Sequence, residues 1–241
     1  MPTLLLVRHG RTAANADGVL AGRTPGVDLD ETGRAQAAAL AERMAPLPLV
    51  SLVTSPLERC QQTAAALVAT GGTAKIPRPH PVVDERLSEC DYGDWTGKTL
   101  GVLAKEPMWS VVQAHPSAAV FPGGETLRNV QSRAVDAVRE HDARVQGEHG
   151  DRCVWALVSH GDVIKALLAD ALGMHLDAFQ RIAVDPCSVS VVSYTPLRPF
   201  VLRSNDTGGD LTPYVPSGRK GRRQRSARSD AAVGGGAGPG R

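Results

Sequence analysis

Two histidines of this 241-residue chain lie in equivalent positions, each directly after an apolar run and directly before a glycine. Residues 4–7 lead into Arg8 and His9, and residues 154–159 lead into His160. Ligands of open α/β sheets bind beyond the carboxyl ends of the strands, so imidazoles that follow neighbouring strands can converge on one ligand. A neutral imidazole can attack phosphorus, and a second one can stabilise charge on the transferred group. The pattern therefore predicts phosphoryl-transfer chemistry.

Arg59 adds another cation to this set. It lies at the start of a predicted helix in which Ser55 is the N-cap, a proline follows it, and Glu58 completes a capping box. A cation in the first turn opposes the helix dipole by about 0.3–1 kcal/mol unless an anion lies between them. Guanidinium groups match phosphoryl oxygens in pairs, and nearby cations disfavour protonation of an imidazole. We therefore expect Arg8 and Arg59 to bind a phosphoryl group beside a neutral His9.

A leaving alcohol also needs a proton, and an acid-rich segment can supply it. Residues 84–91 contain Asp84, Glu85, Glu89 and Asp91. A bound phosphate dianion would raise the affinity of any of these carboxyls for its proton. Their spacing does not choose among the four.

The elements that must position these residues alternate between strand and helix patterns. Apolar runs predict strands, and apolar residues at helical spacing predict helices after Asp30 and after Gly161. Residues 76–121 carry weak signals and are expected to be partly irregular. The remaining predicted strands and helices are strands at 4–7, 50–54, 154–159, 187–194 and 199–203, and helices at 55–68 and 125–145. This alternation predicts an α/β fold, a three-layer sandwich with a mostly parallel central sheet flanked by helices.

Composition excludes several classes of protein. Hydrophobic residues make up 42% and charged residues 22% of the chain, as in a globular protein. No run approaches the roughly 20 apolar residues that span a bilayer, and the N-terminal run is too short for a signal peptide. The cysteines occur singly, which predicts no disulfide, no metal site and a cytoplasmic location. We expect no cofactor and no membrane partner.

The C-terminal segment differs from the rest in charge. Residues 206–241 contain seven Lys or Arg against three Asp, a net +4, whereas residues 1–205 carry −2. The segment is rich in Gly, Ser and Arg and has too little apolar surface to order itself. We therefore predict a catalytic domain over residues 1–205 and a disordered basic tail over 206–241. Nucleic acid is expected as a partner only through weak, non-specific contacts of this tail.

These residues belong to a longer series of motifs. The sequence around Arg8-His9-Gly10 resembles the Arg-His-Gly signature of the histidine phosphatase superfamily, also called the phosphoglycerate mutase-like family. The resemblance covers about residues 3–205. Its blocks stand in family order at residues 4–12 with Asn15, 29–37, 55–64, 87–89 with 92–97, 122–125 and 158–161.

The resemblance implies a role for each site residue. His9 would be transiently phosphorylated, Arg8, Arg59 and His160 would form the phosphate pocket, and Glu89 would be the proton donor. Asn15 would contribute to the phosphate side of the site, and no metal would be needed. Arg23, in the loop after the first strand, is a further candidate for substrate contact.

The same resemblance leaves three activities to weigh. Phosphoglycerate mutases of this family have a longer segment between the acid and the second histidine, with basic residues for a carboxylate. Here no paired arginines occur between Trp95 and Pro122. We therefore predict a metal-independent phosphomonoesterase acting on a small phosphorylated metabolite. A phosphomutase that needs a bisphosphorylated primer is the first alternative, and a non-catalytic phosphate-binding module is the second. These motifs specify neither the substrate nor the oligomeric state.

Overall fold

Six strands form one sheet in the order β3-β2-β4-β1-β5-β6. The computed structural model describes residues 1–71 and 77–215. β3, β2, β4 and β1 run parallel to one another, and β5 and β6 add an antiparallel hairpin at the β1 side. The strand bounds are β1 Thr3–Arg8, β2 Leu49–Thr54, β3 Pro81–Val83, β4 Val154–Ser159, β5 Val189–Tyr194 and β6 Pro199–Asp206.

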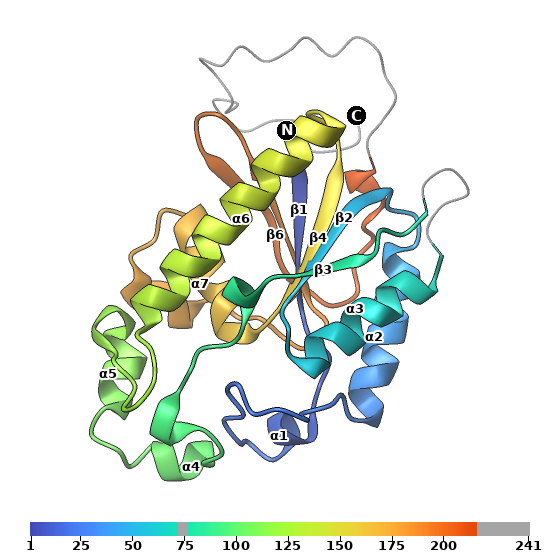
Figure 1. Cartoon of the computed structure of the whole chain (residues 1–241). Helices are drawn as coiled ribbons and strands as arrows, with labels where there is room; N and C mark the ends of the chain where they lie inside the picture. The colour runs from blue at the N-terminus through green and yellow to red at the C-terminus, as the bar shows by residue number, and fades with distance from the viewer. Residues whose placement is uncertain (72–76, 216–241) are drawn as a thin grey trace.

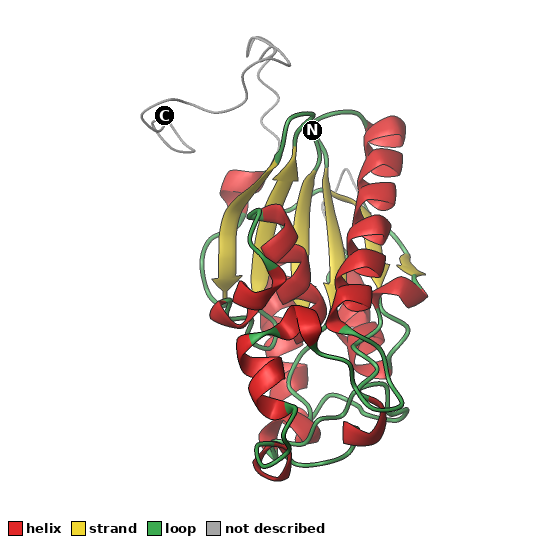
Figure 2. Cartoon of the chain, turned by 90° about the vertical axis from the view of Figure 1, so that its left-hand side faces the viewer, coloured by secondary structure: helices red, strands yellow, loops and turns green. Residues whose placement is uncertain are grey.

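Helices cover both faces of this sheet (Figures 1 and 2). The α-helices are α1 Ala13–Ala16, α2 Glu31–Met44, α3 Glu58–Ala69, α4 Leu100–Leu103, α5 Trp109–Ala114, α6 Leu127–His149 and α7 Gly161–Ala171. Alternate residues of β1 point to opposite faces, so Leu5 and Val7 pack with α2 and α3, whereas Leu4 and Leu6 pack with α6 and α7. The predicted three-layer α/β sandwich with a mostly parallel sheet is confirmed.

The short helices lie beyond one edge of the sheet. α1, α4 and α5 gather past the carboxyl ends of the central strands, at the bottom of Figure 1. The loop after β1 and the segment before α4 are joined by main-chain hydrogen bonds, Leu20 N to Lys98 O at 2.9 Å and Gly97 N to Leu20 O at 2.8 Å. These segments therefore cover the edge at which we expect the site.

One local prediction was wrong, and one predicted stretch contains an additional short strand. Helix α3 begins at Glu58 with Leu57 as its N-cap and has no side-chain cap, so Ser55 and Glu58 form no capping box. Glu58 Oε1 instead accepts from Gly26 N at 3.1 Å. The predicted irregular stretch contains strand β3, whose Val82 and Val83 are exposed and whose three residues are too few to show a periodic pattern. Arg59 still lies in the first helical turn, so the argument for an anion there stands.

The folded part continues past the predicted boundary at residue 205. Leu211 is 1% exposed and packs in the core beside α2, and the carboxylate of Asp206 accepts a hydrogen bond from Arg43 at 2.6 Å. Residues 206–215 were assigned to the tail because their Gly and Asp content is typical of an unstructured segment and no local pattern indicates these contacts. The rest of that predicted tail, residues 216–241, lies outside the described residues. No helix within the described ranges is long and apolar enough to cross a membrane.

Candidate active site

Three neighbouring strands end together at the site. In the parallel registers Arg8 is opposite Ser159, and Thr54 is opposite Val158. The ladder continues one residue further, because His9 N donates to Ser159 O at 2.9 Å. His9, Ser55 and His160, each the first residue after its strand, therefore meet at the same edge of the sheet.

His9 is buried and held in one tautomer. Its Nδ1 lies 2.7 Å from Gly10 O, and since a carbonyl only accepts, Nδ1 carries the hydrogen. The lone pair is then on Nε2, which accepts a hydrogen bond from Arg59 Nε at 3.3 Å. Burial lowers the pKa of His9 well below 6.5, and the charges of Arg59 and Arg8 lower it further. The ring is therefore neutral and directs its unprotonated nitrogen toward the arginine.

Both arginines are held with hydrogen-bond donors to spare. Arg59 is 3% exposed and donates from Nη2 to Gly22 O at 2.7 Å, and Arg8 donates from Nη1 to Val184 O at 2.6 Å. Arg59 Nη1 and Arg8 Nε are buried donors that have no partner within the described part of the chain. Buried donors of this kind are costly unless an acceptor binds them, so the two guanidiniums are suited to an anion.

His160 is the residue that precedes helix α7 and is completely buried. Its ring lies 5.2 Å from that of His9, centroid to centroid, in an edge-on arrangement. Its Nε2 is 2.7 Å from the Ser55 hydroxyl, and burial, followed by the charge of Arg59, lowers its pKa well below 6.5. The sequence predicted Ser55 to be a helix N-cap. The one feature of the sequence that points to its contact with His160 is its position directly after a strand.

Glu89 and Asp84, two of the candidate acids, have pKa values that are shifted in opposite directions. Burial raises the pKa of Glu89 to about 7, and the negative charge of Asp162 raises it as well. Asp84 is paired with Arg86 at 2.7 Å and its pKa is lowered to about 2. Glu89 can thus hold a proton near neutral pH, whereas Asp84 is ionised there.

Asp162 is a contributor that sequence patterns did not reveal. It lies in the first turn of α7, where a carboxylate is stabilised by the helix dipole. Tyr92 donates to its Oδ2 at 2.8 Å, and Lys165 lies 3.7 Å from its Oδ1. Its negative charge is one of the causes that raise the pKa of Glu89. The only sequence signal was an acid two residues after His160.

The side chain of Asn15, unlike those of the other predicted site residues, forms part of a helix cap. It belongs to α1, where its Oδ1 accepts from Thr12 N at 3.1 Å and from the Thr12 hydroxyl at 3.0 Å, while Asn15 N donates back to Thr12 at 3.2 Å. Asn15 thus helps to cap α1, the short helix in the loop that follows His9. With the amide oxygen used by Thr12, its NH₂ group is the end that can donate to a ligand.

Within the described residues, no group of three or more His, Cys, Asp and Glu side chains is placed to hold a metal ion. The site combines the guanidiniums of Arg8 and Arg59 with the imidazoles of His9 and His160, whose pKa values are lowered well below 6.5. The arrangement is suited to bind and transfer a group that carries its own negative charge.

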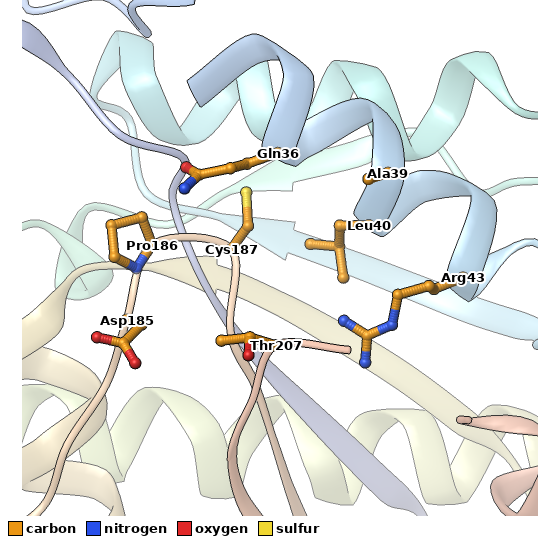
Figure 3. A pocket seen from close by; sticks show the side chains of 8 residues that line it. All are labelled: Gln36, Ala39, Leu40, Arg43, Asp185, Pro186, Cys187 and Thr207. Carbon is orange, nitrogen blue, oxygen red and sulfur yellow. The ribbon is translucent and has the colours of Figure 1, made fainter. Parts of the chain in front are cut away.

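A pocket of about 440 Å³ lies between helix α2 and the segment that precedes β5 (Figure 3). Cys187 N donates to Arg8 O at 3.1 Å, and Gln36 Oε1 accepts from Arg11 N at 3.0 Å. Two residues that line this pocket therefore hold the backbone on either side of His9. The lining residues are Gln36, Ala39, Leu40, Arg43, Asp185, Pro186, Cys187 and Thr207.

Comparison with known proteins agrees with this geometry. The family model of the histidine phosphatase superfamily (branch 1) matches residues 4–207. The chain is 35% identical over 178 residues to the glucosyl-3-phosphoglycerate phosphatase of Mycolicibacterium vanbaalenii, covering 72% of this chain and 76% of the relative. It is 32% identical over 197 residues to a probable phosphoglycerate mutase GpmB of Cronobacter sakazakii, covering 80% and 86%.

Structural similarity extends over the same part of the chain. The structure of mycobacterial glucosyl-3-phosphoglycerate phosphatase Rv2419c in complex with VO₃ matches with a TM-score of 0.74 and 29% identity. The match covers 85% of this chain and 98% of that one. The fold, and not only short motifs, is shared.

Proposed function

This chain belongs to the histidine phosphatase superfamily, and we propose that it is a metal-independent phosphomonoesterase that forms a phosphohistidine on His9. Its substrate is a small phosphorylated metabolite. The observation that carries the proposal is the state of His9, which is buried and neutral with its lone pair on Nε2 beside Arg59. A neutral imidazole fixed in this tautomer can act as a nucleophile without first losing a proton.

The first half-reaction transfers the phosphoryl group to the enzyme. The phosphoryl oxygens bind the spare donors of Arg8 and Arg59, which draws Arg59 off Nε2 and exposes the lone pair. The N–P bond forms as the P–O ester bond breaks, and Glu89 gives its proton to the leaving oxygen. The charges of the arginines, with His160, stabilise the equatorial oxygens during transfer.

The second half-reaction returns the enzyme to its starting state. Glu89, now ionised, takes a proton from a water molecule as the water oxygen bonds to phosphorus and the N–P bond breaks. Inorganic phosphate leaves, and His9 and Glu89 regain their original protonation. A pKa of about 7 suits Glu89 to both tasks, because at neutral pH it can give and accept a proton with little driving force in either direction.

The mechanism needs no metal ion, because guanidinium groups provide the positive charge. We also place the protein in the cytoplasm, since all four of its cysteines are free thiols. Asn15, through its NH₂ group, is proposed as an additional donor to the phosphoryl oxygens.

The test is turnover of p-nitrophenyl phosphate in excess EDTA, with a quench at alkaline pH that preserves phosphohistidine. Wild type is expected to retain activity and to show protein-bound phosphate, and His9→Ala is expected to lose both. His149→Ala, which changes an exposed histidine at the far end of α6, is the matched control. Activity that requires added divalent metal, or that survives in His9→Ala, would refute the mechanism.

The mutase alternative is tested with 3-phosphoglycerate. A phosphatase releases inorganic phosphate from a phosphorylated substrate without a primer. A mutase would produce 2-phosphoglycerate only when bisphosphoglycerate is added. Isomerisation that exceeds phosphate release under those conditions would assign the chain to the mutase class.

A further inference from the structure

The segment that carries Glu89 is not part of a strand or an α-helix. It runs between two short 3₁₀ turns, Glu85–Leu87 and Gly93–Trp95. The main-chain carbonyl of Glu89 accepts hydrogen bonds from Arg23 Nε at 2.9 Å and from Arg133 Nη2 at 3.2 Å. Two guanidiniums therefore hold the backbone of the residue that must place its carboxyl within reach of a leaving oxygen.

Both guanidiniums meet on the carboxylate of Glu125. Its Oε1 accepts from Arg23 at 2.8 Å and from Arg133 at 2.7 Å, and its Oε2 accepts from Arg133 Nε at 3.1 Å. Asp91 N also donates to Oε1 at 2.9 Å. Glu125 is 16% and Arg133 17% exposed, so these charge-assisted bonds are only partly screened by water. One carboxylate thus joins the loop after β1, helix α6 and the Glu89 segment.

The backbone around Glu125 is fixed against the same segment. Glu125 N donates to Asp91 O at 2.9 Å. A Cβ on Gly124 would lie 2.2 Å from Asp91 O, and one on Gly93, whose φ is +51°, would lie 2.1 Å from Pro122 O. Only glycine permits so close an approach of the two chains. The carboxylate of Glu125 is therefore held at a defined distance from Glu89.

We propose that Glu125 is a positioning residue for the proton donor. Its carboxylate gathers Arg23 and Arg133 on the carbonyl of Glu89 and so fixes the direction of the Glu89 side chain. Without that charge the two guanidiniums repel each other and separate, and the Glu89 backbone loses its two donors. The inference relies on the proposed role of Glu89, and the test below separates the failure of one from the failure of the other.

The test compares substrates whose leaving groups differ in their need for a proton. Alkyl phosphates depend on the general acid, whereas 2,4-dinitrophenolate departs without one. General-acid catalysis contributes about 10²–10⁴-fold, so mispositioning by Glu125→Gln is expected to lower kcat/KM for glycerol 2-phosphate by roughly 10-fold or more. For 2,4-dinitrophenyl phosphate we expect less than about a 3-fold change, since a leaving group that needs no proton gains nothing from general acid catalysis.

Glu140→Gln is the matched control. Glu140 lies on α6 and, like Glu125, accepts a hydrogen bond from an arginine, Arg86, at 2.7 Å. Its side chain is 67% exposed, and Arg86 does not bond to the Glu89 carbonyl. We expect this variant to match wild type with both substrates. A selective loss in Glu125→Gln with none in Glu140→Gln supports the proposal.

Two results would overturn it. One is an equal loss with both substrates in Glu125→Gln, and the other is no loss with the alkyl phosphate. Glu89→Gln serves as the reference, because if it shows no selectivity for leaving group, the proposed function itself fails. If Glu125→Gln does not fold, Arg23→Gln is used in its place, because the Arg23 side chain is 40% exposed. This variant removes one of the two donors to the Glu89 carbonyl, and the same selective loss is expected.

Discussion

Glu89 should make the native protein less stable at high pH than at low pH. Burial raises its pKa from 4.5 to about 7, and Asp162 adds to the rise. The folded protein therefore holds this proton more tightly than the unfolded chain. The resulting stability is fully present below pH 4.5 and is lost as the pH rises through about 7. At 1.36 kcal/mol for each pKa unit, ionisation of Glu89 reduces the free energy of unfolding by up to about 3 kcal/mol above pH 7.

Glu89→Gln removes this effect with little change in shape. We expect the variant to be more stable than wild type by up to about 3 kcal/mol at pH 8, and by about 1 kcal/mol or less at pH 5. The measurement is urea-induced unfolding at both pH values. Buffers without phosphate are required, because an anion that binds the native state would stabilise it by mass action. Groups that do not interact with Glu89 contribute equally to both proteins and cancel in the difference.

The control for this prediction is a carboxylate that is exposed in the native protein. Glu140→Gln removes an exposed carboxylate whose pKa is lowered by its bond with Arg86, so it should show no stabilisation at pH 8. If Glu89→Gln gains no more stability over wild type at pH 8 than at pH 5, then Glu89 is not held protonated by its surroundings. The assignment of the proton donor would then have to be abandoned.

Three further changes follow from the same geometry. Asp162→Asn removes a negative charge that raises the pKa of Glu89, so the alkaline limb of the kcat/KM profile for an alkyl phosphate should move from about pH 7 to lower pH; an unmoved limb would contradict this. Ser55→Ala removes the hydroxyl 2.7 Å from His160 Nε2 and should lower kcat/KM about 10-fold, a typical value for one buried hydrogen bond, whereas unchanged steady-state kinetics would rule out a supporting role. Gly93→Ala places a methyl group 2.1 Å from a main-chain oxygen at positive φ and should lower the free energy of unfolding by more than about 2 kcal/mol in urea, and a smaller loss would show that the backbone contact relaxes.

The sequence predicted the parts of the site that regular elements position. His9 and His160 follow strands whose apolar runs are long and uninterrupted, and adjacent parallel strands bring their carboxyl ends together. Arg59 was found for a similar reason, because a helix begins just before it. In these cases the chain near each residue determines its place, so local pattern and sheet geometry were enough.

The sequence could not predict contacts between a side chain and a distant backbone. Ser55 was taken for a helix cap, because Ser followed by Pro is a strong capping signal, yet its hydroxyl faces His160 across 105 residues of chain. Arg23 and Glu125 are separated by 102 residues and meet only because two irregular segments fold over the same edge. No periodicity marks such segments, so their partners emerge only from the folded structure.

The arrangement around Glu89 reconciles two requirements that oppose each other. A general acid must be placed accurately, and arginines are the strongest donors available for that, but an arginine bonded to the carboxyl would lower its pKa and ionise it at neutral pH. Arg23 and Arg133 bond to the Glu89 carbonyl, and the Glu89 carboxyl accepts from Cys90 N at 2.9 Å. The guanidinium charge is meanwhile balanced by Glu125. In the proposed mechanism, Glu89 is thereby positioned by cations without losing its proton to them: the donors to its backbone fix its position, and the groups around its carboxyl set its pKa.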